Sequence, residues 1–173
     1  MIFGPGDNRF LPAILSRARA GKLKFGVGKG DKLSDFTYIS NLTDALLSAD
    51  ERLGTDPRVG GQAYFITNGE PMAFFAFVSE MLKELKLPPI KGLVPFAVAY
   101  PVAALAEFWD TLKGGTLNAE DGMTRFAIRY MCTHHYFSIE KAKRDLGYVP
   151  KVNLAEGIRL TARHELGQEP VHA

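Results

Sequence analysis

The first seven residues, Met-Ile-Phe-Gly-Pro-Gly-Asp, place the strongest constraint on what this chain can fold into. Two apolar residues lead directly into Gly-Pro-Gly, a pattern typical of a buried strand that ends in a tight loop. A strand needs neighbours for its backbone hydrogen bonds, and the rest of the chain offers few strand candidates. We therefore expect this loop to lie at the edge of a sheet whose other strands are mostly missing from the chain.

Size, charge and cysteine content exclude several classes of protein. The 173 residues are 46% hydrophobic and 23% charged, which is ordinary for one folded domain. The net charge of +2 is too small for a nucleic-acid-binding surface. Cys132 is the single cysteine, so it forms no internal disulfide, and it has no Cys or His partners at metal-site spacing. We predict no metal site, no nucleic-acid partner and a reducing compartment.

Hydrophobic periodicity predicts alternating helices and strands. Residues 8–20 have apolar side chains at helical spacing. Residues 22–27 and 35–39 alternate between polar and apolar, which predicts a hairpin across the polar turn at 28–32. A helix follows from Asn41 to Leu53, with Ser40 or Asn41 as its N-cap.

The remaining elements follow the same logic. Residues 63–67 form a predicted strand, and a helix opens at Pro71. Residues 123–130 form a predicted short helix. A helix capped by Ser138 ends at Gly147, and a last helix covers about 153–166.

Residues 92–106 form the longest uncharged run, and Pro95 and Pro101 interrupt it. The run is shorter than the roughly 18 to 20 apolar residues of a membrane-spanning helix. Phe108 and Trp109 follow it, which suits the surface of a bilayer. A buried core helix or a pocket lid explains the same pattern, and both interpretations stay open.

Three motifs, taken together, resemble the extended short-chain dehydrogenases. They occur in the family's order and at suitable separations. They are Ile2-Phe3-Gly4-Pro5-x-Asp7, Asp35-Phe36-Thr37-Tyr38-Ile39-x-Asn41 and Ser138-x-x-Lys141-Ala142-x-x-x-Leu146-Gly147-Tyr148-x-Pro150.

Within that superfamily the chain most resembles the 3β-hydroxysteroid dehydrogenase family, in particular its sterol-4α-carboxylate 3-dehydrogenases, which decarboxylate their product. The segment at 61–71 and Thr133-x-x-Tyr136 carry this narrower match. The resemblance implies an α/β fold: the C-terminal part of an extended short-chain dehydrogenase, with an incomplete NAD(P)-binding Rossmann fold and a mostly helical substrate-binding region. Residues 1–166 would be this substrate-binding part, and residues 167–173 a disordered tail.

The resemblance also implies the reaction of the complete enzyme. NAD or NADP would take hydride from C3 of a 3β-hydroxysterol, and the resulting β-keto acid would lose CO2. The family's catalytic Tyr-x-x-x-Lys pair is missing here, because none of the six tyrosines has a lysine four residues later. Without its acid–base pair the chain is expected to be inactive alone, with no catalytic residue of its own.

By resemblance, Ile2 and Phe3 would lie beside the nicotinamide ring. The substrate pocket would be bordered by Gly4, Pro5, Asp35, Tyr38, Phe96 and Tyr100. For Asp35 and Tyr38, hydrogen bonding that anchors the next helix is an equal alternative.

The substrate would be a sterol or steroid, and the protein would lie on the cytosolic face of the endoplasmic reticulum membrane or of a lipid droplet. A cytoplasmic location and a homodimer stay open. Two other functions also stay open: an extended short-chain dehydrogenase or epimerase for another substrate, such as a nucleotide sugar, and a non-catalytic lipid-binding protein. The sugar alternative would use Arg125 and Arg129 to bind a diphosphate, although their spacing also fits a solvated helix face.

Overall fold

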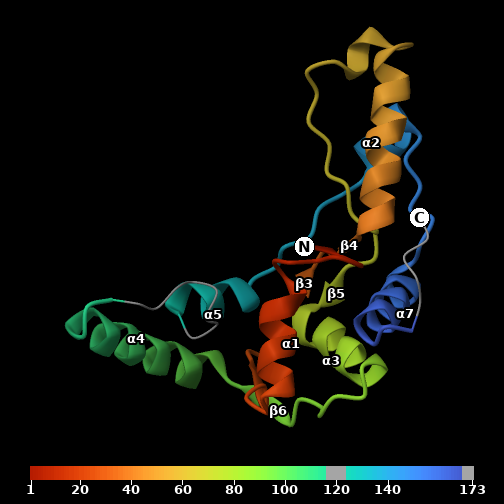
Figure 1. The fold of residues 1–173 in the computed structure, drawn as a ribbon. Coiled ribbons are helices and arrows are strands. Elements are labelled where there is room, and N and C mark those ends of the chain that lie inside the picture. The colour runs from red at the N-terminus through yellow and green to blue at the C-terminus, as the bar shows by residue number, and fades with distance from the viewer. Residues whose placement is uncertain (116–123, 169–173) are drawn as a thin grey trace. The chain divides into compact units, whose positions relative to one another are not determined.

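The computed structural model describes residues 1–115 and 124–168 (Figure 1). It consists of two units, which are described separately. Unit 1 comprises Met1–Phe10, Ser34–Met72 and the chain from Tyr136 onward, and unit 2 comprises Leu11–Leu33 and Ala73–His135. The strands β3 (Leu33–Ser34) and β5 (Met72–Ala73) lie where the chain passes from one unit to the other. Most of the tail predicted for 167–173 lies outside the described residues.

Unit 1 is built on two parallel strands, β1 (Ile2–Phe3) and β4 (Thr37–Tyr38). Ile2 is paired with Thr37, and Phe3 with Tyr38. Three α-helices and one 3-10 helix complete the unit. They are α2 (Ile39–Leu53), the 3-10 helix Pro57–Val59, α6 (Glu140–Leu146) and α7 (Leu154–Glu165).

The C-terminal helices of unit 1 lie where the sequence predicts them, but the predicted Ser138 cap of α6 is wrong. Asn153 caps α7 by accepting a hydrogen bond from the Glu156 backbone N–H at 2.8 Å. Gly147 ends α6 in the left-handed conformation, at φ 69°. Ser138 Oγ accepts the Glu140 N–H at 3.3 Å, although Ile139 holds the N-cap position.

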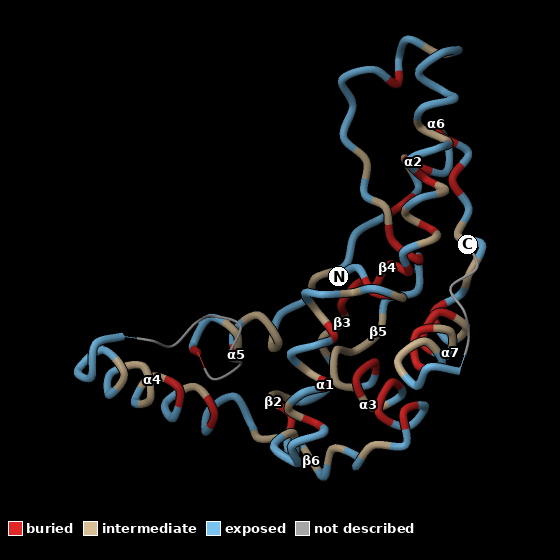
Figure 2. The backbone as a smooth tube through the Cα atoms, in the orientation of Figure 1, coloured by how far each residue is buried: buried red, intermediate tan, exposed pale blue. Residues whose placement is uncertain are grey.

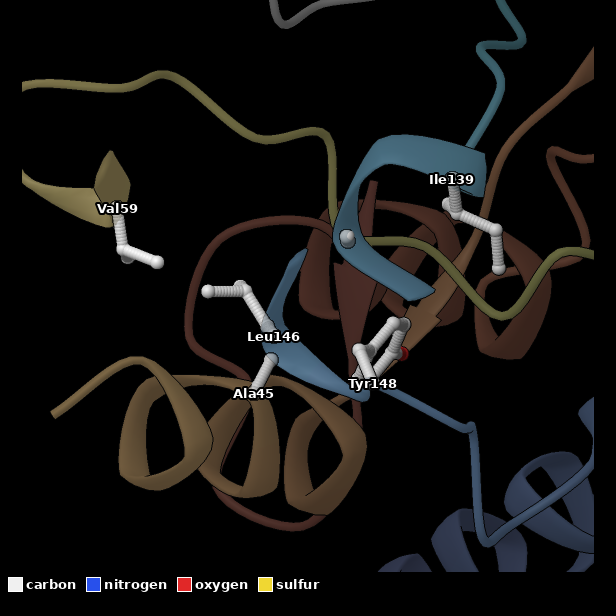
Figure 3. Close-up of a cluster of buried hydrophobic side chains, with 6 residues drawn as sticks. Ala45, Val59, Ile139, Leu146 and Tyr148 are labelled. Atoms are coloured by element: carbon white, nitrogen blue, oxygen red, sulfur yellow. The ribbon is translucent and has the colours of Figure 1, made fainter. Parts of the chain in front are cut away.

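A buried hydrophobic cluster lies in unit 1 around α6 and α2 (Figure 3). The cluster consists of Ala45, Val59, Ile139, Ala142, Leu146 and Tyr148. Burial of each large apolar side chain contributes about 1.5–3 kcal/mol. Its members come from α2, the 3-10 helix and the 139–148 segment, so the cluster joins the C-terminal part of unit 1 to its middle part.

Unit 2 contains the second parallel pair, β2 (Phe25–Val27) and β6 (Gly92–Val94), and four helices among its residues outside 116–123. They are α1 (Leu11–Arg19), α3 (Phe74–Glu84), α4 (Phe96–Leu112) and α5 (Arg125–Met131). Figure 2 shows that α1 and α3 each bury one face, whereas α4 is mostly exposed or half-buried. The predicted start of α5 at 123 lies outside the described residues.

Two of the predicted strand arrangements are wrong. Residues 22–27 and 35–39 form no hairpin, because β2 and β4 each pair in parallel with a strand distant in sequence. The polar–apolar alternation of 22–27 fits a parallel neighbour as well as an antiparallel one, and at Gly26 a Cβ atom would lie 2.6 Å from a Leu93 methyl group of β6. Residues 63–67 form no regular strand; next to them, the Asn68 N–H donates to the Phe36 carbonyl at 3.1 Å.

Two predicted helix starts also need correction. Neither Ser40 nor Asn41 caps α2, which begins at Ile39 with Tyr38 in the N-cap position. Pro71 does not open α3, because β5 comes first and the helix begins at Phe74.

Candidate functional site

The loop after β1 depends on the close approach of its backbone to α2. Phe3 is buried at 1% exposure and Ile2 is 49% exposed, because neighbouring strand residues point to opposite faces. Gly4 has φ 149°, and a Cβ atom there would lie 2.5 Å from Ile39 Cγ2. Pro5 follows, half-buried. The predicted cofactor contacts therefore consist of one exposed apolar side chain, Ile2, and one buried support, Phe3.

Asp35 and Tyr38 have well-defined anchoring contacts in unit 1. The Asp35 carboxylate accepts a 2.7 Å hydrogen bond from the Phe137 N–H. The backbone carbonyl of Asp35 accepts a second one, also 2.7 Å, from the N-terminal amine of Met1. Burial raises the pKa of the Asp35 carboxyl above its ordinary value. The Tyr38 ring packs edge-on against Phe3, with a centroid distance of 5.6 Å. These contacts support the anchoring alternative, and a pocket role for either residue stays a prediction.

A buried amide pair holds unit 1 together behind this loop, and the sequence reasoning missed it. Asn41 Nδ2 donates to Asn68 Oδ1 at 2.9 Å and to the Val152 carbonyl at 2.7 Å. Asn41 Oδ1 accepts the Lys151 and Val152 N–H groups at 3.0 Å each. All four hydrogen-bonding positions of the Asn41 amide are therefore used.

A cleft of about 510 Å³ lies within unit 2. Its walls come from the β2–β3 loop, the start of α4 and the end of α5. The apolar part of the lining is Pro95, Phe96, Ala97 and Met131, and the charged part is Lys29, Asp31, Lys32 and Arg129. Phe96, a predicted pocket residue, lies in this lining.

The β2–β3 loop is held against the wall of this cleft. The Gly28 N–H donates to the Val94 carbonyl at 2.9 Å. Gly28 has φ 91°, and a Cβ atom there would lie 2.9 Å from Cys132 Sγ. Only glycine fits this position, and burial raises the pKa of the Cys132 thiol.

Tyr100, the other predicted pocket residue in unit 2, is connected to the cleft through Arg129. The Arg129 guanidinium donates to Tyr100 Oη at 3.1 Å and lies 5.5 Å from the centre of the ring. Arg125, one turn earlier, instead pairs with Glu107 at 2.5 Å. The two arginines that the sequence presented as equivalent candidates therefore differ: only Arg129 lines the cleft.

The structure separates the predicted site residues into two groups. Phe96 and Tyr100 belong to unit 2, whereas the other six belong to unit 1. The six are Ile2, Phe3, Gly4, Pro5, Asp35 and Tyr38.

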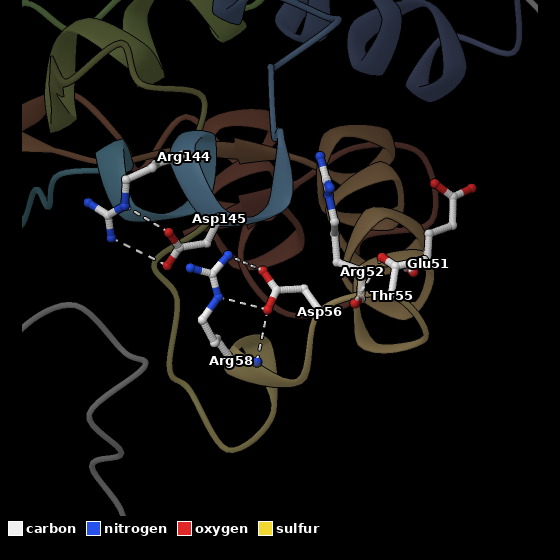
Figure 4. Close-up of polar contacts among 7 residues, drawn as sticks. All are labelled: Glu51, Arg52, Thr55, Asp56, Arg58, Arg144 and Asp145. Carbon is white, nitrogen blue, oxygen red and sulfur yellow. Dashed lines mark hydrogen bonds and ion pairs between the residues drawn. The ribbon is translucent and has the colours of Figure 1, made fainter.

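A second, more polar cleft of about 320 Å³ lies in unit 1, between the end of α2 and α6 (Figure 4). Arg58 donates two hydrogen bonds to Asp56, at 2.9 and 2.8 Å. Arg144 pairs with its neighbour Asp145 at 2.8 Å. Arg58 and Arg144 of this cleft are therefore each paired with an aspartate.

Two further features bear on the expectations above. Within residues 1–115 and 124–168, no helix combines the length and apolar character needed to cross a membrane. In the same ranges, no group of three or more His, Cys, Asp or Glu side chains is placed to hold a metal ion.

Several of the similar solved structures are enzymes named for nucleotide sugars. A UDP-glucuronic acid 4-epimerase from Bacillus cereus in complex with NAD matches 98% of this chain and 44% of its own, with a TM-score of 0.60 and 16% identity. A dTDP-glucose 4,6-dehydratase from Bacillus anthracis, also with NAD, matches with a TM-score of 0.59. These likenesses establish the fold, which is that of the extended short-chain dehydrogenases, present here in part.

The curated relatives are more similar in sequence. A 2-alkyl-3-oxoalkanoate reductase of Stenotrophomonas maltophilia is 39% identical over 92% of this chain and 47% of its own length. The decarboxylating sterol-4-alpha-carboxylate 3-dehydrogenase of Mus musculus is 35% identical over 94% of this chain and 45% of its own. The chain thus spans about half the length of these relatives.

A family model supports the same assignment. The model of the 3-beta hydroxysteroid dehydrogenase/isomerase family matches residues 1–95, more than half of the chain. This match includes the loop after β1, the Asp35–Tyr38 segment and the glycine-rich wall of the unit 2 cleft. The chain belongs to the 3-beta hydroxysteroid dehydrogenase/isomerase family.

Proposed function

We propose that this chain forms the substrate-binding part of an NAD(P)-dependent oxidoreductase that oxidises the 3β-hydroxyl of a sterol bearing a 4α-carboxylate. The observation that carries the proposal is the cleft of unit 2, which combines an apolar wall with positive charges. A sterol acid is complementary to this lining, because it has a large apolar body and one negative group. The relatives named for sterol-4-alpha-carboxylate support this choice.

The cofactor, NAD or NADP, accepts the hydride in this chemistry. Ile2 fits a place beside a nicotinamide ring, because its side chain is exposed and apolar, and buried Phe3 fixes the strand behind it. The side chains described here bind and orient the substrate, and none of them forms the Tyr-x-x-x-Lys pair that moves the proton. We therefore expect the chain to bind substrate but to lack turnover alone.

The proposed reaction proceeds in two steps. Loss of hydride from C3 and of the hydroxyl proton gives a ketone two carbons from the carboxylate carbon. The C–C bond to the carboxylate then breaks, because its electron pair moves toward the carbonyl and forms an enolate, and CO2 leaves. A cleft that holds the carboxylated substrate and limits water would serve both steps.

A second substrate is supported by the 2-alkyl-3-oxoalkanoate reductases. A 2-alkyl-3-oxoalkanoate and an oxidised 4α-carboxysterol share one substructure: a carboxylate, an alkylated carbon and then a ketone. In the sterol the alkyl groups close into rings. The proposed activity is therefore the interconversion of alcohol and ketone at the carbon β to the carboxylate, on an apolar acid.

Assay of the full-length product of this gene tests the proposal. A 4α-carboxysterol with NAD+ or NADP+ is expected to give reduced cofactor, CO2 and a 3-ketosterol. In the reverse direction, a 2-alkyl-3-oxoalkanoate with reduced cofactor tests the acyclic alternative. Turnover of a nucleotide sugar, with neither acid used, would refute the assignment.

We further propose peripheral attachment to the endoplasmic reticulum or a lipid droplet through α4. This helix buries only the small residues Ala99 and Ala103, while its large apolar side chains are exposed. These exposed side chains include Val98, Val102, Leu105, Phe108 and Trp109. Co-flotation with phospholipid vesicles tests this surface, and complete release from membranes by low-salt washing would count against it.

A further inference from the structure

We propose that Arg129 binds the carboxylate of the substrate, with Lys29 as a second positive charge, so that the unit 2 cleft selects apolar acids over their neutral analogues. This inference rests on the proposed function and adds a substrate-binding residue to it. It also gives a reason why relatives named for a sterol carboxylate and for an alkanoate could use the same cleft.

The setting of Arg129 supports a ligand-binding role. The helix that carries it is fixed, because Ile128 packs with Ala99 and Ala103 of α4 in a buried cluster. Tyr100 orients the guanidinium by one hydrogen bond and by its ring. Within residues 1–115 and 124–168, Arg129 makes no ion pair, and its bond to Tyr100 uses one of its five N–H donors.

The charges in the cleft favour an anion. Lys32 pairs with Asp31 at 3.1 Å, which neutralises the carboxylate of the lining. Lys29 and Arg129 add two further positive charges, so the described lining has a net positive charge. Arginine binds a carboxylate through two parallel hydrogen bonds, which lysine cannot reproduce.

The apolar part of the cleft determines the kind of anion. Pro95, Phe96 and Met131 border the same space as Arg129. A diphosphate is polar over its whole surface. Against this apolar wall it would lose hydrogen bonds to water without forming new ones, which is unfavourable. An acid with an alkyl or ring body satisfies both the cationic and the apolar lining.

Calorimetric binding of two probes tests the inference on the full chain. The probes are a medium-chain 2-alkyl-3-hydroxyalkanoate and its methyl ester, which keeps the shape and loses the charge. Arg129→Ala is expected to weaken binding of the acid about tenfold or more and to leave the ester within about twofold. Arg129→Lys keeps the charge without the paired geometry and is expected to give an intermediate loss. Arg125→Ala, on the same helix but outside the cleft lining, is the matched control and is expected to bind the acid normally.

The outcomes separate this inference from the proposed function. If acid and ester bind equally and Arg129→Ala changes neither, the carboxylate role is overturned while the apolar cleft stands. If neither probe binds the folded wild-type chain, the substrate assignment fails as well. Equal weakening by Arg125→Ala would show a general effect of helix charge and would also overturn the role of Arg129. If the wild type binds the acid more tightly than the ester, and this preference is lost on Arg129→Ala but not on Arg125→Ala, the carboxylate role and the substrate assignment are both supported.

Discussion

Replacement of Asn41 by alanine is expected to destabilise unit 1 by about 3 kcal/mol. The amide is fully buried and makes four hydrogen bonds to residues 68, 151 and 152. Two acceptors keep other partners, since Asn68 Oδ1 still accepts from Tyr38 N and the Val152 carbonyl from Asn68 Nδ2. The part-buried N–H groups of Lys151 and Val152 lose the partner that the structure gives them, at the lower part of the range of about 1–3 kcal/mol for each unsatisfied group.

Urea unfolding followed by circular dichroism measures this effect. With a slope of about 2 kcal/mol/M, a loss of about 3 kcal/mol lowers the midpoint by about 1.5 M. Thr43→Ala is the control on the same helix, because the Thr43 side chain is exposed, and it is expected to shift stability by no more than about 0.5 kcal/mol. An Asn41→Ala midpoint within about 0.3 M of the wild type would refute the view that this amide joins the three segments.

Two other substitutions test the packing of unit 1. Gly157→Ala is expected to destabilise by about 1–3 kcal/mol despite alanine's helix propensity, because a Cβ atom would lie 2.9 Å from the Tyr38 ring and 3.0 Å from Phe3; a higher urea midpoint would contradict this. Tyr148→Phe is expected to cost about 1 kcal/mol, through loss of its 2.9 Å bond to the Thr67 carbonyl. Burial raises the pKa of Tyr148 to about 12, so the unfolded chain loses this proton first and stability should fall between pH 10 and 12. Tyr148→Phe should reduce that fall, and an identical pH profile would contradict the assignment.

The helices could be predicted from local sequence because their signals are local. Asn153 and Gly147 act as the cap and the stop that their residue types suggest. The strand pairing could not be predicted in the same way. The alternation at 22–27 is compatible with an antiparallel or a parallel neighbour, and the actual partner of β2 lies at 92–94.

The roles of the site residues also depend on partners distant in sequence, which local patterns do not predict. Asn41 resembles a helix cap in sequence, but its partners at 68 and 151–152 are determined by tertiary packing. Arg125 and Arg129 are equivalent by spacing, and only their tertiary partners separate them: Glu107 pairs with Arg125, and Tyr100 contacts Arg129. The family motifs identified the loop after β1, whereas the charged lining of the unit 2 cleft became visible only in three dimensions.

The most direct test combines binding and turnover in one preparation of the 173-residue chain. The account predicts that the chain binds the 2-alkyl-3-hydroxyalkanoate or a 4α-carboxysterol but forms no reduced cofactor with NAD+ or NADP+ above a no-protein blank. Binding without turnover would agree with a chain that holds the substrate while the proton-transferring pair lies outside these residues. Formation of reduced cofactor that scales with the concentration of the chain would contradict the central claim.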